Sequence, residues 1–433
     1  MASTIGFSTH SVLAEAATEA GRVVRQSRER PALVLLLATH SYPLDQLAGA
    51  ASALHALFGP GVQIAAGTVN GLLYRKVRYD AMLAQQRAAA VVGLGWADVP
   101  GERVGAALAP DPRPEPRRVG RELAERARAA LGGARLESGL LFSPGLPHDE
   151  LPLDPGLVDG LRQSEPSIAV AGTGLSGGVD LQGLCDPGFA LLGDRVERGG
   201  ALFLAFEGRA EGDGPRRTAL AVANGLRAVD APPLGVINRA EGARIFTLDG
   251  APAFGRVLEA VRRHKRGRES NPGDLEKNLG LAMVERRLSL AVEDPAGDFF
   301  WPRIPLRSKP DGSFLEAFEA EPGEVLRLVE ADEASCLEAT REAALRLREG
   351  RPAEAPFELV LAFSCSIRGF VLGARAAEEG RELGSVALCD DDGVLGVVAN
   401  GEFGTHRGGR PRATGWAHSL FGLSGDRRTG DAG

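Results

Sequence analysis

The sequence has little of what marks a secreted, membrane-spanning or nucleic-acid-binding protein. Only four cysteines occur among 433 residues, and they form neither a CxxC pair nor a dense framework, so we expect free thiols in a reducing compartment. The longest apolar runs, around residues 32–38 and 88–97, are much shorter than the ~20 residues of a membrane-spanning helix. No basic residue precedes Arg22, which argues against a secretory signal. We therefore expect a cytoplasmic protein without a membrane partner.

An excess of positive charge is also absent. The chain has 57 acidic and 50 basic residues and a formal charge of −7, so a dominant basic face for nucleic acid is not expected. What the chain does have is an ordinary globular composition, 44% hydrophobic and 25% charged, together with 57 glycines. Glycine at this level, without the period of collagen, indicates many turns between short strands.

One pattern occurs three times: a buried strand, a polar loop, a helix, and a second strand that ends in a glycine turn. The three loops that follow the first strands are residues 38–43, 143–148 and 364–369. The three glycine turns are residues 67–71, 172–178 and 401–404. Further β structure follows each turn, and strands outnumber helices. The sequence predicts an α/β fold: two domains with mixed, largely antiparallel sheets covered by helices, built from repeated β-α-β-β units.

Two copies of the pattern lie before residue 210 and one lies after residue 355, so the boundary between domains is expected in a polar stretch between them. We predict an N-terminal domain over residues 1–212, with two internal repeats, and a C-terminal domain over residues 213–424. The last residues, 425–433, are expected to form a disordered tail.

The second glycine turn contains two overlapping motif matches. Residues 172–177 fit GxGxxG and residues 174–178 fit GxSxG, but both chemistries need a helix directly after the glycines. The residues that follow do not form a helical pattern, so we interpret this segment as a turn that ends a strand.

Cys365 lies where a buried strand meets a loop, three residues before Arg368. A nearby guanidinium favours the thiolate form that a nucleophilic cysteine needs. The alternative is a buried structural cysteine, with Arg368 paired to a carboxylate such as Glu402.

Two histidines, His40 and His148, occupy the strand-to-helix loops of the first two copies, where α/β folds bind ligands. A single imidazole there can ligate haem iron, hydrogen-bond a small anion, or have no special role.

The C-terminal half resembles the C-terminal half of FIST proteins. The resemblance rests on an apolar strand that ends in Cys-x-x-Arg, residues 359–369, followed by the Gly-Glu-Phe-Gly turn of residues 401–404. The opening of this half, residues 239–253, and the loop and turn near His40 and Gly67 extend it over about residues 30–424. The chain departs from the family where Ser366-Ile367 replaces a frequent Ala-Gly, and where residues 69–72 lack the glutamate of the first turn.

The resemblance implies a cytoplasmic small-ligand-binding sensory protein that acts in signal transduction through a partner in trans, such as a histidine kinase or a cyclic-nucleotide signalling enzyme. Ligands in the family include amino acids. One alternative is a haem-binding nitric oxide sensor with His40 as axial ligand, because some members carry haem; another is an enzyme with Cys365 as nucleophile. The residues expected to bind the ligand are Cys365, Arg368, Glu402, Asn400, His40, Thr68, Asn70, Thr173 and Ser176.

Overall fold

The structure is a computed structural model of the whole chain. It describes residues 4–27, 31–43, 45–96, 103–144, 155–179, 185–208, 218–264, 279–294, 297, 299–318, 320–351, 357–386, 388–389, 393–406 and 409–424. The predicted domain boundary between residues 212 and 213 lies outside the described residues, and so do His148 and the predicted tail over residues 425–433. None of the described helices combines the length and the hydropathy needed to cross a membrane.

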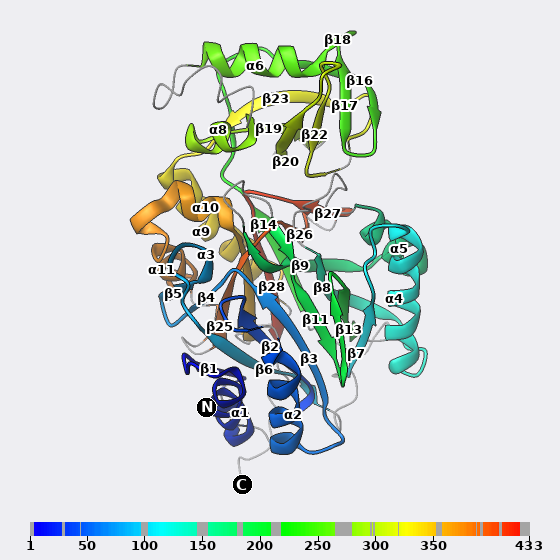
Figure 1. Cartoon of the computed structure of the whole chain (residues 1–433), viewed down its shortest axis with the longest axis vertical. Coiled ribbons are helices and arrows are strands. Elements are labelled where there is room, and N and C mark those ends of the chain that lie inside the picture. Colours follow the sequence, from blue (N-terminus) through cyan, green and yellow to red (C-terminus); the bar gives the residue numbers. More distant parts are fainter. Residues whose placement is uncertain are drawn as a thin grey trace.

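The α/β fold predicted from the repeats is confirmed, and the repeats are longer than the sequence pattern indicated. Three units follow one another and share the order strand, helix, strand, helix, strand, two-stranded hairpin, strand, to which each unit adds one short helix or strand. Figure 1 shows their arrangement. The first unit consists of β1 (Ile5–Ser8), α1 (Leu13–Ser27), β2 (Pro31–Thr39), α2 (Gln46–Phe58), β3 (Gln63–Val69), β4 (Gly71–Tyr74), β5 (Val77–Asp80), α3 (Ala81–Ala84) and β6 (Ala89–Trp96). The second consists of β7 (Val104–Ala109), α4 (Pro116–Ala130), β8 (Leu136–Pro144), α5 (Pro155–Ser164), β9 (Ala169–Val179), β10 (Cys185–Pro187), β11 (Phe189–Leu192), β12 (Arg195–Arg198) and β13 (Ala201–Glu207).

The third unit begins with β14 (Thr218–Ala223) and resumes only after a large insertion. Its remaining elements are α9 (Glu333–Glu349), β24 (Phe357–Cys365), α10 (Ser366–Leu372), α11 (Glu378–Ser385), β25 (Val394–Ala399), β26 (Glu402–Thr405), β27 (Pro411–Thr414) and β28 (His418–Ser424). A short 3-10 turn, Gly373–Arg375, joins α10 to the segment before α11. The loop predicted over residues 364–369 is therefore wrong in part: the strand continues to Cys365, and α10 starts immediately after it.

Each unit contributes four neighbouring strands to one sheet, and a two-stranded hairpin from another unit extends that sheet to six. In the second sheet β10 also pairs with β9. The strand orders are β1-β6-β2-β3-β11-β12, β7-β13-β8-β9-β26-β27 and β14-β28-β24-β25-β4-β5. In each sheet the central pair, β2 with β3, β8 with β9 and β24 with β25, is parallel, and its other neighbours are antiparallel. Because each hairpin continues the chain from one parallel pair into the next sheet, the three units meet where those pairs end.

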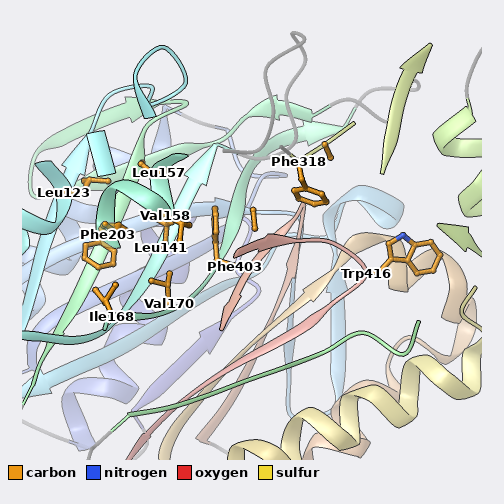
Figure 2. Packing of buried hydrophobic residues seen from close by; sticks show 14 of the residues in the cluster. Leu123, Leu141, Leu157, Val158, Ile168, Val170, Phe203, Phe318, Phe403 and Trp416 are labelled. Carbon is orange, nitrogen blue, oxygen red and sulfur yellow. The ribbon is translucent and has the colours of Figure 1, made fainter. Parts of the chain in front are cut away.

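The inner faces of the three sheets share one core, which includes Leu35, Leu140 and Phe363. The outer faces are covered by helices: α1 and α2 on the first sheet, α4 and α5 on the second, α9 and α11 on the third (Figure 1). Figure 2 shows the second of these outer layers, where Leu123 and Leu157 of the helices pack near Leu141 and Phe203 of the sheet. Burial on both faces explains why the central strands are continuous apolar runs.

The insertion between β14 and α9 forms a separate nine-stranded sheet with its own core, at the top of Figure 1. It consists of β15 (Arg227–Ala228), β16 (Gly235–Glu241), β17 (Arg244–Leu248), β18 (Ala251–Pro252), α6 (Ala253–Arg263), α8 (Leu279–Glu285), β19 (Leu288–Glu293), β20 (Phe300–Arg303), β21 (Pro305–Ser308), β22 (Phe314–Glu316) and β23 (Val325–Glu330). We refer to residues 227–330 as the inserted domain.

The second glycine segment differs from the predicted turn. Residues 172–178 are part of one continuous strand, β9, rather than a turn that ends it. Gly172 has φ +152°, and a Cβ at this position would lie only 1.9 Å from the carbonyl oxygen of Leu141. Glycine is thus required here so that two strands can approach closely, and neither the GxGxxG nor the GxSxG context is present. The other two predicted turns are shorter than expected: only residue 70 separates β3 from β4, and only residues 400–401 separate β25 from β26, with Gly401 at φ +89°.

Candidate functional site at the junction of the three units

Asn70, Ser176 and Asn400 occupy the same position in the three units. Each directly follows the last paired residue of the second parallel strand, because Val69 pairs with Thr39, Leu175 with Pro144 and Ala399 with Cys365. All three are buried, with at most 3% of their surface exposed. The folding of the repeats therefore brings three polar side chains, far apart in the sequence, to one place.

These side chains contact one another. The Asn70 Nδ2 donates to Oδ1 of Asn400 over 2.5 Å, and the Ser366 hydroxyl donates to the same oxygen over 2.9 Å. The Asn400 Nδ2 lies 3.5 Å from the Ser176 Oγ. The Asn70 Oδ1 has no hydrogen-bond partner in the part of the chain that the structure describes. We call Asn70, Ser176, Asn400, Ser366, Cys365 and Glu402 the junction.

Cys365 and Glu402 form the side of the junction contributed by the third unit. Cys365 ends β24, and Glu402 starts β26, where it pairs with Thr173 of β9. Burial raises the pKa of Glu402 well above its usual range, against smaller opposing effects of Cys365 and Arg368. Burial and the neighbouring Glu402 also raise the pKa of the Cys365 thiol. Burial thus favours the neutral form of both groups. The Glu402 carboxyl lies against the Cys365 thiol and the backbone amide of Ala417, but neither of its oxygens makes a well-aligned hydrogen bond with a described residue.

Arg368 is fully buried beside the junction, and its donors are bound to protein groups. Its Nε donates to Glu379 over 2.8 Å, and its Nη2 donates to the carbonyl oxygen of Cys336 over 2.6 Å and to the Thr340 hydroxyl over 2.7 Å. Its Nη1 lies 3.4 Å from the carbonyl oxygens of Asn224 and Trp416. The carboxylate partner of Arg368 is thus Glu379, not the Glu402 suggested by the structural alternative.

Glu379 stays ionised, although it is as deeply buried as Glu402. Burial raises its pKa, but the combined effect of Arg368, His418 and Arg78 is larger and opposite. The pKa of Glu379 therefore lies well below its usual range. Ser364 donates to its second oxygen over 2.9 Å. We call Arg368, Glu379, Ser364, Thr340 and His418 the Arg368 cluster.

The remaining predicted ligand residues differ in how free their side chains are. The hydroxyl of Thr68 accepts from the backbone amide of Phe189 over 2.9 Å, and the hydroxyl of Thr173 donates to the carbonyl oxygen of Gly174 over 3.1 Å. His40 is half-buried in the turn after β2, and its Nε2 has no hydrogen-bond partner among the described residues. Burial lowers the pKa of His40, so its imidazole is neutral.

Sequence reasoning missed the partners of Arg368. Glu379 is eleven residues away on another helix, and Thr340 lies on α9, which the repeat pattern did not single out. A weak signal existed, because Glu379 lies on the buried face of an amphipathic helix, where an acidic residue needs a cation. No sequence signal identifies which cation that is.

Two family models match the chain: the FIST N domain over residues 32–251 and the FIST C domain over residues 258–405. A search of curated proteins finds no match. Among solved structures, that of PurLQS from Thermotoga maritima matches with 11% identity over 74% of this chain and 72% of that chain; its TM-score of 0.22 is too low to support an inference. The two family matches span most of the chain, which therefore belongs to the FIST family of sensory signal-transduction proteins.

Proposed function

We propose that this protein senses a small polar ligand that binds at the junction. The observation that carries the proposal is a set of buried polar atoms that make no well-aligned hydrogen bond with a described residue: the Asn70 Oδ1 and both oxygens of Glu402. Buried polar groups in folded proteins are nearly always hydrogen-bonded to protein, water or a ligand. Since an unpaired buried group costs about 1 to 3 kcal/mol, a ligand that pairs with several of them gains affinity from each.

The ionisation of the junction favours an uncharged polar ligand group. Asn70 offers an acceptor, and the neutral carboxyl of Glu402 offers both a donor and an acceptor. A carboxamide, which carries two N–H donors and a carbonyl acceptor, matches this set. Among amino acids, we expect asparagine and glutamine to bind better than their carboxylate counterparts.

In this proposal Arg368 does not contact the ligand, because a ligand that bound the guanidinium would have to displace one of its present acceptors. Arg368 instead holds the protein groups next to the junction in place. Thr68 fixes the backbone near the end of β3 and Thr173 fixes it within β9, and His40 is available at the edge of the site. The protein works in the cytoplasm, where its free cysteines remain reduced. Because the three units share one core, a ligand that pulls their junction together can change the surface offered to a signalling enzyme in trans.

Isothermal titration calorimetry with the amino acids, their amides and small acids tests the proposal. We expect saturable binding of a carboxamide to the wild type, and a loss of about tenfold or more in affinity for Asn70→Ala and for Glu402→Ala. The exposed Arg348→Ala serves as the control and should bind normally. If the two junction variants bind every ligand as the wild type does, the junction is not the site.

Haem binding through His40 is the alternative that one observation favours, namely a neutral imidazole with an unpartnered Nε2. A Soret band after haem reconstitution that is lost in His40→Ala would support this alternative, and purified protein that takes up no haem would exclude it.

A further inference from the structure

A groove of about 610 Å³ lies apart from the junction, where the inserted domain meets the third unit. Its walls come from three segments: the residues that follow β14, the connection from β19 to β20, and one face of α9. Sites for small molecules commonly have volumes of about 300 to 1,000 Å³ and commonly lie between domains. The groove therefore has the size and the place of a ligand site.

One part of the groove is apolar. The half-buried Phe300 and Leu345 line it, in front of the buried Leu226 and Phe299. The ring of Phe299 is held in place by an edge-on contact with Trp301, at 4.8 Å between ring centroids. A rigid aromatic wall of this kind suits a flat apolar ligand body.

The charged side chains of the groove leave one cation without a counter-ion. Two of its three arginines are paired with its two glutamates: Arg227 with Glu338 at 2.8 Å, and Arg346 with Glu342 at 2.7 Å. The third, Arg341, is exposed on α9 and has no ion pair in the described parts of the chain. The groove thus carries one net positive charge next to an apolar wall.

We propose that this groove is a second binding site, for a small amphipathic anion with an aromatic or otherwise apolar body and a single anionic group. The apolar body lies against Phe300 and Leu345, and the guanidinium of Arg341 binds the anionic group with two parallel hydrogen bonds. The chemistry differs from that of the junction, where the free groups are neutral and polar.

Asn224 links this groove to the Arg368 cluster. Its side chain lines the groove, donates to the carbonyl oxygen of Phe300 over 2.5 Å and accepts from the amide of Leu226 over 3.1 Å. Its own carbonyl oxygen lies 3.4 Å from Nη1 of Arg368. A ligand in the groove therefore lies one hydrogen-bonded residue away from the cluster that supports the junction.

A pair of fluorescent probes tests the proposal: anilinonaphthalene sulfonate, and phenylnaphthylamine, which has the same rings without the sulfonate. We expect the sulfonate to bind the wild type with a stoichiometry near one, and at least about tenfold more tightly than the neutral probe. Arg341→Ala should weaken the sulfonate by about tenfold and leave the neutral probe unchanged. Arg348→Ala, on the same helix but outside the groove, is the matched control.

Equal sulfonate affinity in the wild type and Arg341→Ala would overturn the proposal. So would an equal loss in Arg341→Ala and Arg348→Ala, because the effect would then be one of overall charge. Asn70→Ala should leave the binding of both probes unchanged. The probe experiment therefore tests the proposed groove site independently of the proposed junction site.

Discussion

The junction and the Arg368 cluster are two neighbouring buried polar regions that differ in how completely their groups are paired. In the Arg368 cluster the guanidinium donates to Glu379 and to four other residues, and both oxygens of Glu379 accept hydrogen bonds. In the junction the Asn70 Oδ1 and both oxygens of Glu402 make no well-aligned hydrogen bond with any residue that the structure describes. The two glutamates are equally buried, yet Glu379 is ionised and Glu402 is neutral.

The difference shows that the charge of a directly paired cation, here Arg368, together with hydrogen bonds, outweighs burial in deciding the ionisation of a buried carboxyl group. A cluster whose groups are all paired contributes to the fold, and removing one member leaves the others buried without a partner. A cluster with unpaired neutral groups has donors and acceptors left for a ligand. The predictions below test this distinction.

The largest effect is expected for Arg368→Met, because it leaves Glu379 buried without its main counter-charge. We expect the free energy of unfolding to fall by about 3 to 5 kcal/mol, as for other broken buried ion pairs. Urea denaturation measures it, with the exposed Arg348→Met as the control, for which we expect a change below about 0.5 kcal/mol. A loss of less than 1 kcal/mol for Arg368→Met would mean that the cluster is not structural.

A third buried glutamate, Glu316 of the inserted domain, separates burial from hydrogen bonding. Neither of its oxygens has a hydrogen-bond partner among the described residues. Its ion-pair partner Arg303 lies 3.6 Å away through Nε and is bound more closely to Glu324 through Nη2, at 2.8 Å. Burial raises the pKa of Glu316 to about 8, and Arg303 only partly opposes this. Its state thus resembles that of Glu402 rather than that of Glu379.

We therefore expect a pH-dependent difference between the wild type and Glu316→Gln. The folded chain keeps the proton of Glu316 up to about pH 8, whereas the unfolded chain loses it near the ordinary value of 4.5. The free energy of unfolding of the wild type thus falls as the pH rises between these values. The amide of Glu316→Gln does not titrate, so the variant does not lose stability in this way. The free energy of unfolding of the variant, relative to that of the wild type, should therefore rise by about 2 to 4 kcal/mol between pH 5 and pH 8.5 in urea denaturation. A difference that does not vary with pH would place the pKa of Glu316 near its ordinary value.

The sequence predicted the α/β fold and the place of the junction because both follow from local patterns. Continuous apolar strands, such as residues 33–37 and 359–363, mark strands buried on both faces, and the residues directly after them mark the ends of strands. Asn70, Ser176 and Asn400 were among the predicted ligand residues because they lie in or beside the glycine segments that follow the second strand of each repeat. Their direct contact was not predicted, since it depends on the exchange of hairpins between sheets.

What the sequence did not provide are contacts between elements distant in the chain. The pairing of Arg368 with Glu379, and the insertion of a whole domain between β14 and α9, depend on tertiary structure. The groove beside Arg341 was missed for the same reason, because its walls come from three segments, including one in the inserted domain. Local patterns carry no information on which of several charged residues meet in the core.

A smaller effect is expected for Glu402→Gln, which sharpens the contrast between the two glutamates. Because the Glu402 carboxyl is already neutral, the amide is nearly isosteric with it, and the free energy of unfolding at pH 7 should change by less than about 1 kcal/mol. Glu379→Gln removes a charge that Arg368 needs and should cost about 3 kcal/mol. Similar losses in both variants, measured by urea denaturation, would contradict the assigned ionisation states.

The smallest change concerns the reactivity of Cys365, which also tests the alternative of a cysteine nucleophile. Its thiol is 2% exposed, and burial together with Glu402 raises its pKa, so the thiolate that reacts with alkylating agents is scarce. Cys389 is only half-buried and serves as the internal reference. The folded protein is treated with iodoacetamide near neutral pH. Mass spectrometry should then find Cys365 alkylated more slowly than Cys389. Faster alkylation at Cys365 would require a thiolate that the surroundings of Glu402 disfavour, and it would make the enzyme hypothesis the better one.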